Sequence, residues 1–157
     1  MAEKRLQAQE VFSYLRSDQV NAISNESEVI QYRAGDTVYY RGAQADRTYV
    51  VLEGQVSLRL PGKGGLTVPI DVAAPGDMFG SCLCFDMETY TTTAQCTQDS
   101  KLMSIDSLGL RELMDGDLPM GYAIQRKISQ VYFRRYLETM QKLQAIVMNI
   151  PLEQEVA

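Results

Sequence analysis

The hydrophobic pattern changes its period along the chain, and each change marks a different kind of element. Residues 3–16 carry apolar side chains at helical spacing, which predicts an amphipathic N-terminal helix. Ser17 or Asp18 would cap a second short helix over residues 20–23. From Val29 the period falls to two, as is typical of half-buried strands. We expect strands over residues 29–32, 37–40, 47–52, 55–60, 66–73 and 101–105.

Turns rich in glycine and proline separate these strands at nearly even intervals. The turn signals lie at residues 35–36, 42, 53–54, 61–65 and 75–77. Many short strands at such spacing favour a closed or double-sheet antiparallel architecture. We therefore predict a mainly β fold, an antiparallel jelly roll, in which residues 61–65 form the tip of a hairpin.

The C-terminal part of the chain returns to helical spacing. Residues 107–114 predict a helix with Ser107 as its N-cap. A longer helix follows, because Pro119 is tolerated in a first turn and nothing interrupts the pattern before Pro151. We predict a single domain over residues 1–157, with N-terminal helices over 1–26, the jelly roll over 27–106 and C-terminal helices over 107–150.

The long helix carries two apolar stripes. Ile124, Ile128 and Val131 form the first, which suits packing on the roll. The second alternates spacings of three and four residues, the pattern of a two-helix seam. Its members are Phe133, Tyr136, Met140, Leu143, Val147 and Ile150.

This seam has two interpretations, packing on the same chain or pairing with a second copy. A helix of ~30 residues is about 45 Å long at ~1.5 Å per residue, which exceeds what a small roll covers. We therefore favour a homodimer through the helix of residues 119–150.

Composition and charge limit the kinds of binding partner that we expect for this chain. The formal net charge is −5 and the sequence pI is about 4.8, so we expect no direct nucleic-acid binding by this chain. No apolar run reaches the ~20 residues that span a bilayer. The first fifteen residues are charged and mixed, unlike a signal peptide. We expect no membrane association and a cytoplasmic location.

The titratable residues argue against catalysis and metal binding. The chain has no histidine, the commonest general base and metal ligand. Cys82, Cys84 and Cys96 would form a thiol sensor, a metal site or buried structural thiols. Zinc usually takes four ligands, and no histidine completes a set. We expect structural thiols in a reducing compartment, no metal and no enzyme activity.

A framework of glycines and acidic residues carries a family resemblance. Its members are Gly35-Asp36, Gly42, Asp46, Tyr49-Val50-Val51, Glu53-Gly54 and Gly76-Asp77-x-Phe79-Gly80. At these spacings the chain resembles the cyclic-nucleotide-binding domain, the sensor module of cAMP-responsive bacterial regulators and of cAMP-gated kinases and channels. The resemblance covers residues 11–150 and implies regulatory binding and dimerisation through the long helix.

The resemblance also raises the question of whether this sequence is a whole protein or a piece of a longer one. In full-length bacterial regulators of this type, a helix-turn-helix domain follows the long helix. Only residues 152–157 follow it here. A free-standing sensor and a piece of a larger regulator are both consistent with that.

The resemblance implies a ligand site at a short helix over residues 81–85. In the family, backbone amides at this helix hold the cyclic phosphate. The corresponding residues are Gly80, Ser81, Cys82 and Leu83, directly after Phe79. The family glutamate falls on Ser81, the family arginine on Tyr90, and the hydroxyl that follows it on Thr91. Residues 80–99 contain no arginine or lysine.

Two missing charged contacts change the expected ligand. Each would contribute ~1.5–3 kcal/mol, so their loss weakens nucleotide binding by about two to four decades. Three alternatives stay open: a different, less charged ligand, a pocket filled by side chains such as Tyr90, or weak nucleotide binding through amides alone. The hydroxyls available to a ligand belong to Ser81, Tyr90, Thr91, Thr92 and Thr93.

Tyr136 on the long helix has two interpretations, stacking on a base or packing in the seam. We predict no cofactor beyond a cyclic nucleotide or another small anionic ligand. A ligand-free dimerisation module is the alternative function. A cupin-type enzyme is a further one, and the lack of histidine counts against it because cupins typically hold a metal with histidines.

Overall fold

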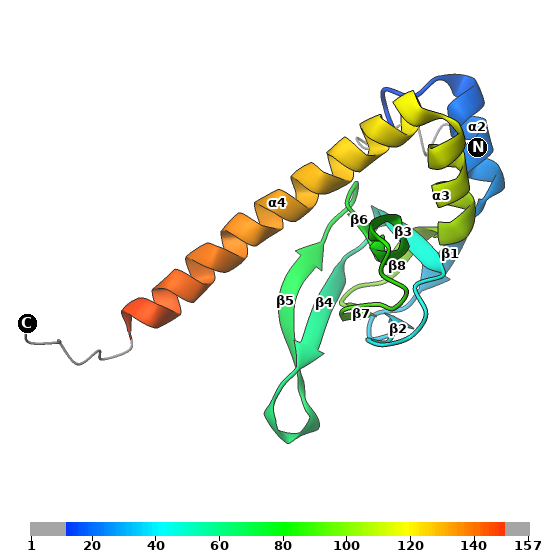
Figure 1. Cartoon of the computed structure of the whole chain (residues 1–157). Coiled ribbons are helices and arrows are strands. Elements are labelled where there is room, and N and C mark those ends of the chain that lie inside the picture. The colour runs from blue at the N-terminus through cyan, green and yellow to red at the C-terminus, as the bar shows by residue number, and fades with distance from the viewer. Residues whose placement is uncertain (1–11, 150–157) are drawn as a thin grey trace, which may run out of the picture.

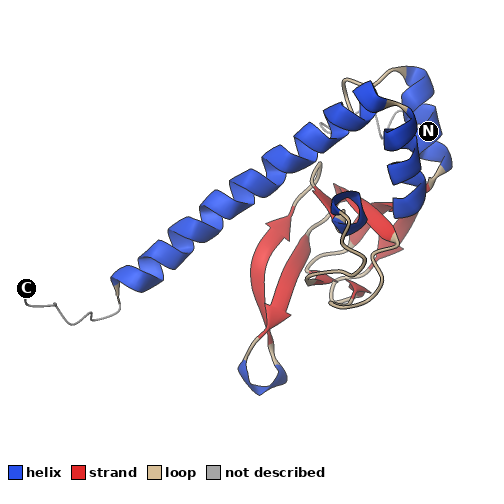
Figure 2. Cartoon of the chain, viewed as in Figure 1, coloured by secondary structure: helices blue, strands red, loops and turns tan. Residues whose placement is uncertain are grey.

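Two four-stranded antiparallel sheets form the body of the protein in the computed structural model, which describes residues 12–149 (Figures 1 and 2). The first sheet has the order β1 (Ser27–Tyr32), β8 (Ser100–Asp106), β3 (Arg47–Glu53) and β6 (Met78–Phe79). The second has the order β2 (Thr37–Tyr39), β7 (Thr93–Cys96), β4 (Val56–Pro61) and β5 (Thr67–Ala73). The predicted mainly β jelly-roll class is confirmed.

Helices gather at one end of the first sheet, and one of them leaves the body (Figure 1). They are α2 (Ser17–Asn25), α3 (Ser107–Gly116) and α4 (Leu118–Met148). Two 3-10 turns complete the chain: η1 (Lys63–Gly65), at the tip of the β4–β5 hairpin as predicted, and η2 (Cys82–Phe85). The predicted long helix is confirmed as α4, with Pro119 in its first turn.

The N-terminal helix prediction is corrected in part. Helix α2 already begins at Ser17, so neither Ser17 nor Asp18 is its cap. The Arg16 backbone N–H donates instead to Gln19 Oε1 at 3.0 Å. Of the helix predicted over residues 3–16, residues 3–11 lie outside the described residues, and the next ones form a turn.

The predicted cap of α3 is wrong by one residue. The Asp106 carboxylate accepts the Gly109 N–H at 2.8 Å, so Asp106 is the N-cap. Ser107 is the first helical residue, and its buried hydroxyl bonds Thr48 Oγ1 at 2.9 Å. Both residue types cap helices well, and burial of the serine decides between them.

Strand β3 is buried on both faces and joins two hydrophobic clusters. Val50 faces the helices, whereas Tyr49 and Val51 face the inside of the roll. On β8, Met103 belongs to the helical cluster and Leu102 to the roll. Because both of its faces are covered, β3 carries a continuous apolar run over residues 49–52 instead of a polar face.

The first half of helix α4 packs on the body of the protein, and the second half is exposed. Ile124 and Ile128 are buried in the helical cluster, as predicted for the first stripe. Asp117 caps the helix by accepting the Met120 N–H at 3.2 Å and also accepts Gln19 Nε2 at 2.9 Å. This contact ties the start of α4 to α2.

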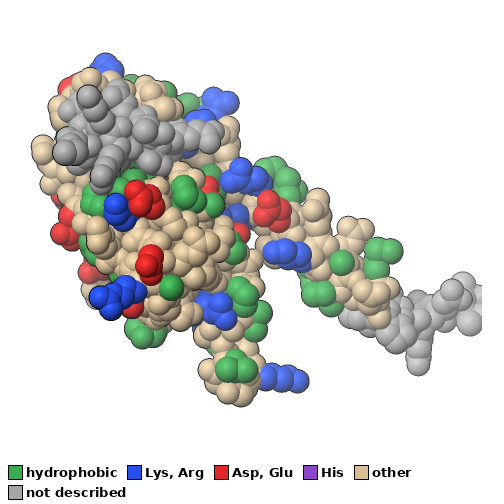
Figure 3. Space-filling view, turned by 180° about the vertical axis from the view of Figure 1, so that it is seen from behind, with side chains coloured by type: hydrophobic (Ala, Val, Ile, Leu, Met, Phe, Trp, Pro, Cys, Tyr) green, Lys and Arg blue, Asp and Glu red, His purple; other side chains and the backbone are tan. Residues whose placement is uncertain are grey.

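The second stripe is not buried against its own chain. Five of its members are 43–61 % exposed: Phe133, Tyr136, Met140, Leu143 and Val147. Ile150 lies outside the described residues. Figure 3 shows hydrophobic side chains along the projecting part of α4. Of the two interpretations of the seam, packing on the same chain is therefore not observed.

Gly54 is the turn glycine whose replacement we expect to cost most. It has a φ of +93°, and a Cβ there would lie 2.6 Å from the Asp99 carbonyl oxygen. Gly42 has a φ of +86° with nothing within 4 Å. Both Gly→Ala variants carry the left-handed strain of ~1–2 kcal/mol, and Gly54→Ala adds a backbone clash. We expect Gly54→Ala to lower the unfolding free energy by at least ~1 kcal/mol more than Gly42→Ala in urea denaturation. Equal losses would contradict this packing.

Candidate functional site

The segment after β6 brings the chain over a layer of aromatic rings. Gly80 has a φ of +72°, and a Cβ there would lie 3.2 Å from the Tyr39 ring and 3.3 Å from the Tyr90 ring. Glycine therefore allows both the turn and the close approach. The predicted short helix follows as the single 3-10 turn η2. Phe79, just before the turn, is fully buried inside the roll.

Tyr90 lies inside the roll. Its ring stacks on Tyr39, with centroids 3.6 Å apart and planes 9° apart, and it is 4 % exposed. Its hydroxyl donates to the Arg47 carbonyl at 2.6 Å and accepts from the Arg47 N–H at 3.1 Å. Burial raises the pKa of Tyr90, partly opposed by the hydrogen bond to Arg47. Both hydrogen-bonding directions of this hydroxyl are thus used by the backbone.

Ser81 connects this segment to the long helix. It is fully buried, and its hydroxyl lies 3.1 Å from that of Tyr132 on α4. Burial also raises the pKa of Tyr132, partly opposed by the bond to Ser81. The Ser81 hydroxyl is therefore engaged with a helix of the same chain.

A hollow of about 470 Å³ opens beside this contact. It lies between η2, the loop before β7 and helix α4. The residues that line it are Cys82, Phe85, Met87, Thr91, Ser129, Tyr132 and Phe133. Two of them, Cys82 and Thr91, were predicted site residues, and the other five were missed. Tyr132 could not be found from periodicity because it lies between the two stripes of α4.

The remaining predicted residues lie apart from this hollow. Leu83 lines a separate one with Ala45 and Leu108. Thr92 is half-buried and hydrogen-bonds the Tyr39 side chain. Tyr136 is 57 % exposed and does not line the hollow. The structure therefore places Cys82 and Thr91 on the hollow and Ser81 behind it, in contact with the lining residue Tyr132. Leu83, Tyr90 and Tyr136 do not line it. Their roles toward a ligand stay predictions.

Three arginines border the region, and each has an acidic partner. Arg135 lies 5.6 Å from the centre of the Tyr132 ring and pairs with Asp71 of β5. The others are paired as Arg111 with Asp86 and Arg47 with Glu28. A guanidinium that replaces the family arginine would have to give up one of these pairs.

Cys84 and Cys96 are poor candidates for a thiolate sensor. Burial raises the pKa of Cys84 to about 11 and also raises that of Cys96. Both thiols are therefore protonated at neutral pH. Within residues 12–149 no group of three His, Cys, Asp or Glu side chains could hold a metal ion.

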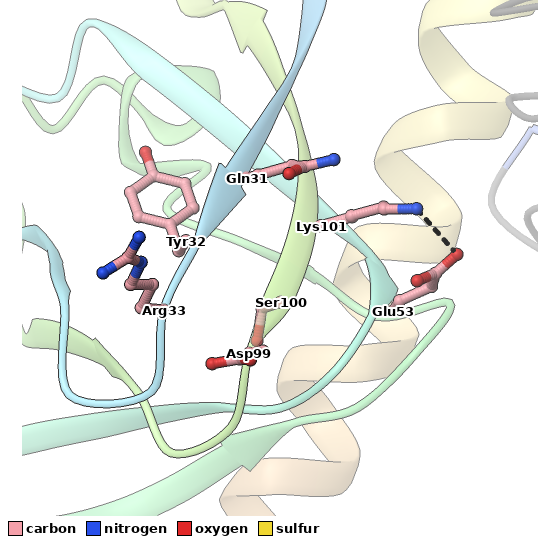
Figure 4. Close-up of a pocket in the computed structure, with 7 residues that line it drawn as sticks. All are labelled: Gln31, Tyr32, Arg33, Glu53, Asp99, Ser100 and Lys101. Atoms are coloured by element: carbon pink, nitrogen blue, oxygen red, sulfur yellow. Dashed lines mark ion pairs between the residues drawn. The ribbon is translucent and has the colours of Figure 1, made fainter.

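A polar hollow of about 420 Å³ at the edge of the first sheet is a weaker candidate. Figure 4 shows Tyr32 and Arg33 on one side of the strands and Gln31, Lys101 and Glu53 on the other. Lys101 Nζ lies 3.5 Å from Glu53 and is paired with it. Since the charged ends do not converge on one point, this hollow lacks a defined binding geometry.

Comparison with known proteins identifies the family. The model of the Cyclic nucleotide-binding domain matches residues 29–117, so this chain belongs to that family. A curated relative is the CRP-like cAMP-activated global transcriptional regulator of Mycobacterium tuberculosis. It is 24 % identical over 137 residues, which are 87 % of this chain and 59 % of the relative. The chain thus spans about three fifths of the length of that relative.

Solved structures agree on the fold. The sensor domain of the transcriptional regulator DNR from Pseudomonas aeruginosa is 20 % identical with a TM-score of 0.71, and the match covers 97 % of this chain and 95 % of that one. The regulatory domain of Toxoplasma gondii PKA, crystallised with cAMP, is 16 % identical with a TM-score of 0.69. That match covers 83 % of this chain and 49 % of that one. At these identities the likeness establishes the fold alone.

The described residues also include no helix both long and apolar enough to cross a bilayer.

The Tyr90 hydroxyl provides a direct test of this geometry. Tyr90→Phe removes both contacts to Arg47 and leaves the part-buried Arg47 carbonyl without that donor, at a cost of ~1–3 kcal/mol. Tyr40→Phe is the matched control, because Tyr40 is 67 % exposed. We expect only Tyr90→Phe to lower the unfolding free energy, measured by urea denaturation. Equal stability of the two variants would show that the Tyr90 hydroxyl is not used in this way.

Proposed function

We propose that this chain is a regulatory ligand-sensing domain that binds cAMP and cGMP only weakly and carries out no catalysis. The observation that carries the proposal is the position of Tyr90. Where the family places an arginine, this chain has a ring stacked on Tyr39 with its hydroxyl bound to the Arg47 backbone. A side chain held in this way offers no charge to a cyclic phosphate.

The second altered position supports the same conclusion. Ser81 is shorter than glutamate and uncharged, and its hydroxyl already contacts Tyr132. Only backbone amides near η2 would then face a phosphate. A hydrogen bond to a charged group contributes ~1.5–3 kcal/mol, so two missing partners lower affinity by about two to four decades.

We propose further that the domain works as a homodimer through α4, in the cytoplasm, and does not bind nucleic acid itself. The exposed seam of Phe133, Tyr136, Met140, Leu143 and Val147 supports pairing of two helices. The net charge of −5 is unfavourable for a nucleic-acid surface. The cAMP-activated transcriptional regulation named for the Mycobacterium tuberculosis relative suggests a role in signal transduction.

A ligand-free dimerisation module is the second candidate function. The engaged hydroxyls of Ser81 and Tyr90 favour it. The open hollow beside them favours the sensing function.

Calorimetric titration with cAMP and cGMP tests the sensing site. We expect dissociation constants of ~0.1–10 mM, against ~1 μM for a complete site. We also expect little discrimination between the two nucleotides and AMP, because the side chains that select the cyclic phosphate are absent. Sub-micromolar binding of either cyclic nucleotide would refute the proposed function.

Light scattering coupled to size-exclusion chromatography tests the dimer. We expect the full chain to be a dimer at micromolar concentration and Leu143→Glu to be a monomer, because two carboxylates would meet in the seam. Gln141→Glu is the matched control, since Gln141 is exposed on α4 but lies off the seam. A monomeric wild-type chain, or a dimer that survives Leu143→Glu, would disprove pairing through this stripe.

A further inference from the structure

We infer that the hollow beside η2 binds a small uncharged molecule built around one or two fused aromatic rings. The inference rests on the proposed function, because it names the ligand class of the same site. It starts from the chemistry of the walls. Among the described residues, the seven that line the hollow carry no charge, and five of them are apolar, aromatic or sulfur-containing.

Two rings make one wall rigid. Phe85 of η2 and Tyr132 of α4 meet edge to face, with centroids 5.6 Å apart and planes 84° apart. Tyr132 is also held by the Ser81 hydroxyl and by the Arg135 guanidinium. A ring fixed from several sides keeps its face in place for a second ring, and aromatic pairs prefer offset or edge-on contact.

The other wall is apolar, and in a single chain it is open to solvent; its Phe133 is also the first residue of the proposed dimer seam. Met87 is 48 % exposed and Phe133 is 61 % exposed. A flat apolar molecule between them and Tyr132 would remove apolar surface from water, which is the main favourable term in such binding. The Thr91 and Ser129 side chains supply hydroxyls to a single polar substituent.

A charged ligand lacks a partner in this hollow. Arg135 of α4, which lies by the Tyr132 ring, is paired with Asp71, and Arg111 of α3 is paired with Asp86. The Ser81 hydroxyl is hydrogen-bonded to Tyr132 and so is not available to a charged group. An ionised group placed there would lose water without gaining a counter-charge, which is strongly unfavourable.

The size of the hollow agrees with a ring system. Its volume is about 470 Å³. Ligand pockets commonly measure ~300–1,000 Å³, and a dry cavity of ~150 Å³ already accepts benzene. Two fused rings with a substituent therefore fit, and a single ring would leave space.

Three probes that share the indole ring and differ in charge test the inference on the full chain. They are indole (neutral), indole-3-acetate (anionic) and tryptamine (cationic). The chain contains no Trp, so indole fluorescence excited beyond tyrosine absorption reports only the probe. We expect saturable indole binding, with both charged probes at least about tenfold weaker because each buries an unpaired charge.

A matched pair of variants locates the binding. Thr91 lines the hollow, whereas Thr89 lines the separate hollow of Leu83 and forms an isolated β-bridge with Gln44. Both side chains are exposed, so we expect both variants to fold. We expect Thr91→Phe to fill the space and weaken indole binding at least about tenfold, and Thr89→Phe to leave it unchanged. Thermal melts of both variants check that they are folded.

Each outcome supports or overturns the inference. Absence of saturable indole binding, equal or tighter binding of either charged probe, or binding that survives Thr91→Phe would overturn it. Such a failure, together with weak cAMP binding in the calorimetric titration, leaves the proposed function standing. Sub-micromolar cAMP binding would instead refute the proposed function itself.

Discussion

The stacking of Tyr90 on Tyr39 is the contact on which the site depends. It joins β2 to the loop before β7, and the Tyr90 hydroxyl closes the layer on the Arg47 backbone of β3. Such a pair adds ~0.5–1.5 kcal/mol beyond the area it buries. A guanidinium in its place would stand in a layer of aromatic rings. In this chain the position is used for internal packing, which is the basis of the weak nucleotide binding that we propose.

Two side chains of α4 connect the helix beside the site to both sheets. Tyr132 and Arg135 are three residues apart and so lie on one helix face. Tyr132 reaches Ser81, just after β6 of the first sheet, and Arg135 reaches Asp71 on β5 of the second. The helix is thus fastened to both sheets within a single turn. Beyond that turn its apolar stripe is exposed.

Most helices, strands and turns could be predicted from the sequence because local residue patterns determine them. Apolar runs and turn glycines predicted most strands, the β4–β5 hairpin and the long helix. Strands β6 and β7 were missed because two residues, and the four of Thr93–Cys96, are too few to show a clear period. The cap at Asp106 instead of Ser107 depended on which side chain the fold buries.

The candidate site was less predictable because its walls come together only in three dimensions. Of the residues named from the resemblance, Cys82 and Thr91 line the hollow, and their role toward a ligand stays a prediction. Helical periodicity selected Tyr136 and not Tyr132, since periodicity does not tell where a helix leaves the body it packs on. The interior position of Tyr90 likewise followed from its contact with Tyr39, 51 residues earlier, which no local pattern contains.

Phe133 makes the hollow and the proposed dimer dependent on each other. Its side chain lines the hollow and is also the first member of the seam. A second helix packed on the seam would cover Phe133 and alter one wall of the hollow, and a molecule in the hollow would contact a residue of the seam. Coupling between two binding events is reciprocal, so each must change the affinity of the other by the same factor. The ligand strengthens dimerisation if Phe133 contacts it better in the paired state, and it weakens dimerisation if Phe133 contacts it better in the unpaired state.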